Sequence, residues 1–237
     1  MDKMPVLFVG HGSPMIGVED NPFTKSLGRL GRELPRPRAV AVVSAHWVTP
    51  GTRVGTQPAP KQIYDFGGFP PELYAVKYPA PGAPGEAKRL VQELGLAADE
   101  SWGLDHGAWT VLKHLYPQAE VPVFQVSLDR GLDFEGHLAL GRKLGVLRER
   151  GLLLLGSGNL THNLRDLDFH EDAKPFDWAL DFDAKAKAAL EARDPQAFTH
   201  PGRTFGESAF RKAHPTAEHY LPLLYALGAS APGDQLS

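Results

Sequence analysis

The chain has 237 residues, of which 42% are hydrophobic, and it carries 25 basic and 28 acidic residues for a formal net charge of −3. This length suits one large α/β domain with a sizeable core, and no Ser/Gly-rich linker or charge run divides it. We therefore expect a single domain over residues 1–237. The near balance of charge argues against a nucleic-acid or membrane-surface partner. The chain has no cysteine, which excludes disulfides, thiolate metal sites and a cysteine nucleophile.

The first residues lack the apolar core of a secretory signal, and no apolar run approaches the roughly 18 residues that span a bilayer. We therefore expect a soluble, cytoplasmic protein. The composition leaves open whether the chain forms a homo-oligomer. The tail over residues 230–237 is expected to fray.

Runs of apolar residues predict the strands of a central sheet. Four runs have the composition of buried strands, and they cover residues 6–9, 39–45, 121–126 and 152–155. A polar, alternating run over 53–57 is typical of an edge strand. Apolar residues at helical spacing predict helices over 22–34, 85–96, 134–150, 176–193 and 219–227. This alternation favours an α/β fold with a mostly parallel or mixed central sheet flanked by helices on both faces.

Three of the predicted buried strands lead into histidines. His11 and His46 lie at the ends of the first two, and His162 follows a Gly-Ser-Gly turn after the last. In parallel sheets, ligands bind at the carboxyl ends of the strands. A neutral imidazole suits Zn, Fe, Cu or Ni, so we interpret His11 and His46 as a pair of metal ligands.

Two histidines leave a first-row metal incompletely coordinated, and the C-terminal helix offers two further candidates. Thr216 is placed to cap that helix, with Glu218 and His219 in its first turn. Adjacent helical residues point about 100° apart, so only one of the two is expected to face the metal. Glu218 would complete a 2-His-1-carboxylate site, typical of non-haem Fe(II), whereas His219 would give a three-histidine site for Zn or Fe.

His162 and His106 are candidates for proton transfer. His162 is interpreted as a general base or a fourth metal ligand, since an unperturbed imidazole titrates near neutral pH; the alternative is a loop residue after a tight strand exit. Asp105 either orients His106 or caps the helix that follows. The remaining histidines that we assign to structural or surface positions are His114, His137, His170 and His200.

Several enzyme classes lack their sequence motif. The chain contains no His-Glu-x-x-His, no Gly-x-Ser-x-Gly and no nucleotide-binding glycine motif. A zincin protease, an α/β-hydrolase and a nucleotide-binding enzyme are therefore not supported.

Six blocks in chain order resemble the class III extradiol ring-cleavage dioxygenases, in their 4,5-DOPA dioxygenase-like branch. They are residues 11–15 (HGSPM), 44–47 (SAHW), 64–70 (YDFGGFP), 104–109 (LDHGAW), 156–164 (GSGNLTHNL) and 214–219 (HPTAEH). The resemblance implies a non-haem metal site of His11, His46 and His219. Glu218 stays as the alternative third ligand, because protocatechuate-type relatives use a glutamate. The resemblance implies that His162 is the catalytic base and that it also serves as a metal ligand.

The resemblance further implies cleavage of a small aromatic diol, a DOPA-like catechol, by O2. It implies one divalent metal ion, Zn2+ or Fe2+, with Fe2+ required for turnover because Zn2+ has no accessible redox change. His106 would stabilise an oxygen-derived group or donate a proton, and Tyr64 and Asp65 would lie in a loop over the substrate. The cations considered for a substrate carboxylate are Arg203, Arg211 and Lys212. The competing interpretations are a zinc-dependent hydrolase of a small amide or ester and a non-enzymatic, Memo-like protein.

Overall fold

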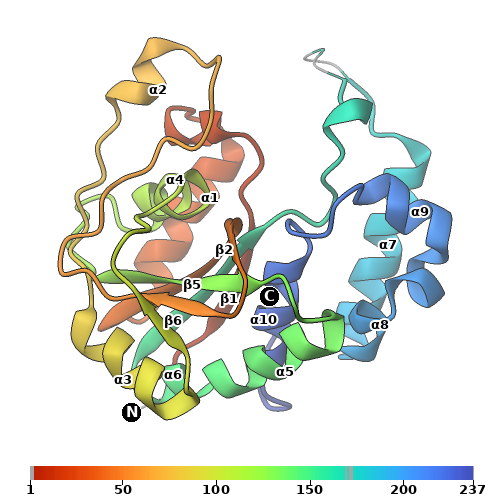
Figure 1. The fold of residues 1–237 in the computed structure, drawn as a ribbon. Coiled ribbons are helices and arrows are strands. Elements are labelled where there is room, and N and C mark those ends of the chain that lie inside the picture. Colours follow the sequence, from red (N-terminus) through yellow and green to blue (C-terminus); the bar gives the residue numbers. More distant parts are fainter. Residues whose placement is uncertain (1–2, 169, 171–172, 237) are drawn as a thin grey trace.

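A computed structural model describes residues 3–168, 170 and 173–236. Its centre is a six-stranded sheet in the order β1-β6-β2-β5-β3-β4 (Figure 1). The strands are β1 (Val6–Gly10), β2 (Ala39–Thr49), β3 (Arg53–Gly55), β4 (Ala97–Asp99), β5 (Val123–Asp129) and β6 (Leu152–Gly158). The first four in spatial order run parallel, whereas β3 pairs antiparallel with β5. The predicted α/β fold with a mixed sheet is therefore confirmed, and β4 is an additional short strand.

The helices are α1 (Pro22–Glu33), α2 (Pro71–Ala75), α3 (Pro84–Leu94), α4 (His106–Leu115), α5 (Phe134–Leu144), α6 (Val146–Glu149), α7 (Asp177–Glu191), α8 (Gln196–Thr199), α9 (Glu207–Ala213) and α10 (Leu221–Ala229). Short 3-10 turns cover Pro14–Gly17 and Leu164–Asp166, and a π-helical turn covers Gly202–Gly206. Within the described residues, none of these helices has the length and apolar character needed to cross a membrane.

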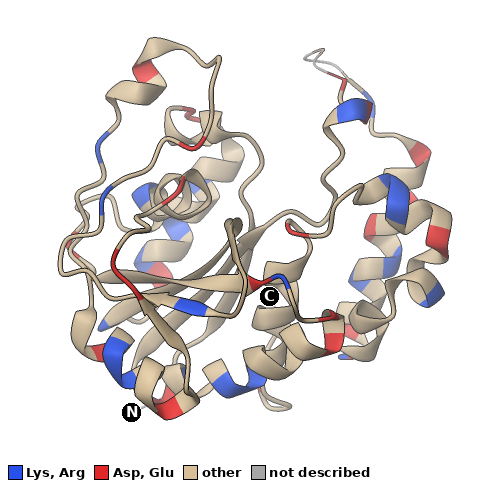
Figure 2. Cartoon of the chain, in the orientation of Figure 1, with Lys and Arg blue, Asp and Glu red and all other residues tan. Residues whose placement is uncertain are grey.

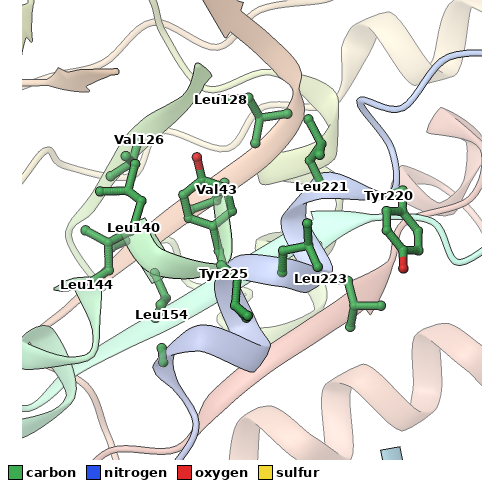
Figure 3. Packing of buried hydrophobic residues seen from close by; sticks show 14 of the residues in the cluster. Val43, Val126, Leu128, Leu140, Leu144, Leu154, Tyr220, Leu221, Leu223 and Tyr225 are labelled. Atoms are coloured by element: carbon green, nitrogen blue, oxygen red, sulfur yellow. The ribbon is translucent and has the colours of Figure 1, made fainter. Parts of the chain in front are cut away.

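The sheet separates two hydrophobic cores, because successive residues of a strand point to opposite faces. In β2, Ala41 and Val43 belong to the core formed with α5, α7 and α10, whereas Val40 and Val42 face the core formed with α1 and α4. Figure 3 shows Val43 among other members of the first of these cores, including Tyr225 of α10. Both faces of the central strands are thus covered. This explains their continuous apolar runs. The charged residues lie mainly on the surrounding helices and loops, with both signs interspersed (Figure 2).

The predicted helix over 134–150 is two helices, α5 and α6, separated at Gly145. Close packing of α10 against α5 depends on glycine. A Cβ atom on Gly141 would lie 2.7 Å from the Tyr225 backbone, and one on Gly228 would lie 2.3 Å from the Leu138 carbonyl oxygen.

The last helix begins two residues later than predicted, at Leu221, so Glu218 and His219 lie in the turn before it and Thr216 does not cap it. Pro222 explains the difference. Proline has no backbone N–H and is tolerated only in the first helical turn, which a start at Leu221 provides.

The tail that we expected to fray is hydrogen-bonded to the rest of the chain as far as Asp234, and Ser237 lies outside the described residues. The buried Arg148 guanidinium donates to the carbonyl oxygens of Met4 and Ala229 and to the Asp234 carboxylate at 2.6 Å. This buried cation joins the start of the chain, the end of α10 and the tail.

Candidate metal centre

Five histidines from distant parts of the chain converge at the carboxyl ends of β1, β2 and β6. The ring centroids of His11 and His46 are 5.0 Å apart, and His219 lies 5.3 Å from His11 and 4.9 Å from His46. His106 lies 3.9 Å from His46, and His162 stacks on His219 at 3.4 Å. All five histidines singled out in the sequence are therefore brought together.

Ser157 of β6 fixes the tautomer of the buried His11 ring. The Ser157 hydroxyl donates to the Gly107 carbonyl oxygen at 2.5 Å, and its oxygen lies 2.9 Å from His11 Nδ1. A hydroxyl has one proton, so Ser157 must accept from His11 Nδ1–H. The lone pair of His11 then resides on Nε2.

One carboxylate, that of Asp65, serves two of the imidazoles. Asp65 Oδ2 lies 3.0 Å from His106 Nδ1 and 3.5 Å from His46 Nδ1, and Oδ1 accepts from the His106 backbone N–H at 2.9 Å. Burial alone would raise the pKa of Asp65, but the hydrogen bonds from His106 hold it below its usual value. Asp65 is therefore an anion in contact with two histidines.

Tyr64, predicted together with Asp65 to line the substrate pocket, is engaged differently. Its hydroxyl donates to the Val76 carbonyl oxygen at 2.6 Å and accepts from Lys77 Nζ at 2.8 Å. Its ring packs edge-on against Phe66 and Trp109. Phe66 in turn meets the edge of His106 at 5.6 Å between ring centroids, so an aromatic loop lies beside the histidines.

Glu218 and His219 occupy unequal positions. Glu218 Oε1 accepts from the Thr216 hydroxyl at 2.8 Å and lies 3.3 Å from His219 Nδ1. The hydrogen bond from His219 is the main reason that the pKa of Glu218 falls to about 2. Glu218 is thus an anionic acceptor on the Nδ1 side of the His219 ring.

The spacing of the Nε2 atoms of His11 and His46 suits two ligands of one metal ion. His11 Nε2 and His46 Nε2 lie 3.1 Å apart. Two nitrogen ligands at about 2.0–2.1 Å from a metal are separated by about 2.8–3.4 Å at octahedral or tetrahedral angles. Nitrogen atoms of His11, His46 and His106 all lie within 4.8 Å of one another, as do ligand atoms of His162, Glu218 and His219.

The protonation states also suit metal binding. Burial lowers the pKa of His11 well below its usual value, that of His46 to about 3 and that of His162 to about 4. His162 is therefore not the unperturbed imidazole that we expected. All three rings are neutral at pH 7, the form that binds metals.

Asp105 caps a helix. It is the N-cap of α4, accepting from Ala108 N–H at 3.2 Å, and it also accepts from the Ser44 hydroxyl and the Gln125 amide. Burial raises the pKa of Asp105. The carboxylate that contacts the His106 ring is that of Asp65.

Residues at the end of β6 hold the backbone of the centre, and our sequence reasoning missed them. Asn159 Oδ1 accepts from Gly12 N–H, and Asn159 N–H donates to the His219 carbonyl oxygen, both at 2.8 Å. A Cβ atom on Gly158 would lie 2.2 Å from that same oxygen. The signal in the sequence was the run GSGN after four leucines, where small and polar residues replace apolar ones.

The other predicted groups lie outside the cluster. His114 and His137 make structural hydrogen bonds, to the Ile16 carbonyl oxygen at 2.6 Å and to the Tyr225 hydroxyl at 2.9 Å. Two of the proposed substrate cations are paired elsewhere: Arg211 lies 3.8 Å from Glu207, and Lys212 lies 3.3 Å from Asp166. Arg203 lies in the π-helical turn after α8.

A cluster of five histidines at the edge of a mixed α/β sheet, with groups of side chains that could hold a metal ion, is typical of a metalloenzyme. Residues 6–234 match the family model described as the catalytic LigB subunit of aromatic ring-opening dioxygenase. The chain belongs to this family of metal-dependent extradiol dioxygenases, which open an aromatic ring with O2. The family suggested by the six sequence blocks is therefore confirmed.

Within this family the chain is similar to proteins named 4,5-DOPA dioxygenase extradiol. The one from Escherichia coli (strain K12) is 47% identical over 238 residues, covering 96% of this chain and 85% of that protein. The one from Beta vulgaris is 36% identical over 232 residues, with 94% and 85% covered. The crystal structure of an uncharacterized protein from Escherichia coli K12 has a TM-score of 0.81 and 43% identity, covering 96% of this chain and 89% of that one.

Proposed function

We propose that this enzyme cleaves a DOPA-like catechol, with O2 as the second substrate, at a metal held by His11, His46 and His219. The observation that supports these three ligands is that an oxygen atom lies beside Nδ1 of each ring. It is the Ser157 hydroxyl for His11, the Asp65 carboxylate for His46 and the Glu218 carboxylate for His219. Such partners fix the tautomer and leave Nε2 as the ligand atom.

The same pattern favours His219 over Glu218 as the third ligand. Glu218 faces the Nδ1 side of His219 and is already shared with the Thr216 hydroxyl. A carboxylate in this position raises the basicity of the imidazole that it contacts. His106 lies within ligand distance of His11 and His46, so a variant at that position belongs in the metal-binding test.

We propose that the enzyme turns over with Fe2+, whereas Zn2+ occupies the same site and allows substrate binding without ring cleavage. The chemistry that Fe2+ supplies when bound is chelation of both catechol oxygens and electron transfer toward O2; Zn2+ lacks the redox change that the second of these needs. Imidazole nitrogen suits both ions, so the donor set fits either.

His162 and His106 divide the proton transfers. His162 is neutral and half-buried, and its free ring nitrogen accepts the proton of a catechol hydroxyl. His106 places Nδ1 3.0 Å from the Asp65 carboxylate, which orients the ring, and we assign to His106 the role of proton donor. We keep His162 as an additional metal ligand in the resting enzyme, because its ligand atom lies within 4.8 Å of those of Glu218 and His219.

For the substrate side chain we propose the pocket of about 590 Å3 beside Glu218. It is lined by Val48 of β2, by apolar residues of the β5–α5 loop and by the exposed Arg130, next to Asp129 and Asp133. An arginine near two carboxylates is complementary to the carboxylate and ammonium groups of an amino-acid catechol.

The test is oxygen uptake after anaerobic Fe2+ loading of metal-stripped protein, with DOPA, protocatechuate and catechol as substrates. We expect uptake with DOPA and a yellow ring-opened product. His46→Ala should abolish tight metal binding, whereas His162→Ala should retain most of the metal and lose turnover; the exposed His200→Ala serves as the control. No uptake by protein with demonstrated Fe2+ would contradict the proposal, and full metal in His219→Ala with loss in Glu218→Ala or His106→Ala would reassign the third ligand.

We also propose that residues 1–237 form one catalytic domain, since the family model spans nearly the whole chain. A single cooperative unfolding transition of the metal-free protein would support this. A cytoplasmic location is consistent with the lack of cysteine, and cell fractionation tests it.

A further inference from the structure

The segment that carries His162 is tied to the C-terminal end of α9 by hydrogen bonds. The His162 backbone N–H donates to the Ala213 carbonyl oxygen at 2.8 Å. The next side chain, Asn163, donates through Nδ2 to the Lys212 carbonyl oxygen at 2.7 Å. The last carbonyl groups of a helix lack partners within the helix, so α9 offers free acceptors here. The position of His162 therefore depends on α9.

A third hydrogen bond comes from His214, the residue after α9. Its Nε2 lies 2.8 Å from the Leu160 carbonyl oxygen, and only 4% of the residue is exposed. A carbonyl oxygen only accepts, so the proton of the His214 ring is on Nε2. The other ring nitrogen, Nδ1, is buried without a hydrogen-bond partner in the described part of the chain.

The surroundings of His214 explain why this unpaired nitrogen is informative. Its ring is packed by the rings of Phe210, Tyr220 and Phe182, at 5.3, 5.1 and 6.0 Å between centroids. A phenylalanine ring would fill such a site without burying an unpaired nitrogen, which destabilises a folded protein. The feature that distinguishes histidine here is the Nε2–H bond to Leu160.

We propose that His214 is a positioning residue for His162: by holding the Leu160 carbonyl it fixes the segment over 160–163 and keeps the His162 ring against His219. The catalytic part of this inference rests on the proposed function, in which His162 accepts the catechol proton. Small displacements of a catalytic group lower kcat strongly, by up to about 100-fold for 1 Å.

Two substitutions separate this role from simple packing. Glutamine places an amide N–H near the position of Nε2, so His214→Gln keeps the donor and changes the shape. In contrast, His214→Phe keeps the ring and loses the donor. We expect His214→Phe to lower kcat by 10- to 100-fold with KM changed less than threefold, and His214→Gln to retain kcat within threefold. A packing role predicts the reverse order, because Phe would then be the tolerated residue.

A second readout does not depend on activity. Amide hydrogen exchange of metal-free protein, followed by NMR, reports the His162 N–H bond to Ala213 directly. We expect protection of this amide to fall at least tenfold in His214→Phe and to stay near wild type in His214→Gln. Asn163→Asp provides a second variant if His214→Phe does not fold: it keeps the Oδ1 acceptor for Arg165 N–H and loses the donor to Lys212. It should also raise exchange at His162.

The matched control is His114, a half-buried histidine whose Nε2 likewise donates to a backbone carbonyl oxygen, that of Ile16, away from His162. Replacing it with Phe or Gln should leave His162 exchange and turnover per folded molecule unchanged. Wild-type exchange in His214→Phe and Asn163→Asp, or equal losses in the Phe and Gln variants of His214, would overturn the positioning role. If the wild-type enzyme shows no ring cleavage, the proposed function fails, whereas the exchange result still decides whether His214 holds this segment.

Discussion

Removing the Ser157 hydroxyl should weaken metal binding, because this hydroxyl determines which nitrogen of His11 is free. In Ser157→Ala, His11 Nδ1 and the Gly107 carbonyl oxygen both lose a buried partner. The ring is then free to carry its proton on Nε2, which blocks the proposed ligand atom. Loss of such an outer partner typically lowers metal affinity by about 10- to 100-fold, or about 1.4–2.7 kcal/mol.

The same substitution should also lower the free energy of unfolding, by about 1–3 kcal/mol for each buried polar group left unpaired. Ser127→Ala is the matched control, since Ser127 is a fully buried serine in β5 that hydrogen-bonds Thr49 and the Arg53 backbone N–H, away from the histidines. Both variants should lose stability, but only Ser157→Ala should lose metal affinity.

Metal affinity is measured by competition between the protein and a chromophoric chelator for Zn2+ and Co2+ at pH 7. The free energy of unfolding of each metal-free protein comes from urea denaturation. Affinity of Ser157→Ala within twofold of wild type, or an equal loss in Ser127→Ala, would refute the tautomer argument.

Three further predictions concern stability. The pKa of His137 is lowered, mainly by burial, to about 4. As pH falls, the unfolded chain therefore binds a proton at His137 before the folded protein does. The free energy of unfolding should fall by about 3 kcal/mol between pH 6.5 and pH 4 for this reason. Urea denaturation of His137→Gln at both pH values should show a correspondingly smaller loss, and parallel pH profiles would contradict this. Gly158→Ala places a Cβ atom 2.2 Å from the His219 carbonyl oxygen. It should lower the free energy of unfolding by about 1–3 kcal/mol and reduce the amount of bound metal; an unchanged melting temperature would contradict this. Asp234→Asn removes the anion beside Arg148. It should lower the free energy of unfolding by about 1.5–3 kcal/mol and make the C-terminal tail easier for carboxypeptidase to digest. Equal digestion of wild type and variant would show that the ion pair does not hold the tail.

The strands and the clustering of histidines were predictable from local patterns. The burial of both Val42 and Val43, on opposite faces of the sheet, follows from continuous apolar runs. Strand ends that carry His11 and His46 must meet at one edge of a parallel sheet. β4 was not predictable, because Ala-Ala-Asp has no strand character outside its pairing with β3.

The hydrogen-bonding partners of the histidines could not be predicted from the sequence, for a different reason. His11 and Ser157 are separated by 146 positions, and they meet only because β1 pairs with β6. No local pattern specifies that pairing. Asp65 shares a loop with aromatic residues and carried no sign that it would contact His46 and His106, so its sequence context suggested contact with substrate. Side-chain roles set by tertiary contacts therefore required the structure.

The position of Asn159 between two segments has a consequence for how the enzyme gains and loses its metal. Its side chain binds the loop after β1 and its backbone binds the turn before α10. The proposed ligands His11 and His219, more than 200 residues apart in sequence, therefore lie in two regions that are both hydrogen-bonded to Asn159. A metal bound to both would join the loop after β1 to the turn before α10 and stabilise the native state, by about 4 kcal/mol at a free concentration 1,000 times Kd. Because Asn159 holds both regions, its loss should shorten the residence time of the metal as well as weaken the fold.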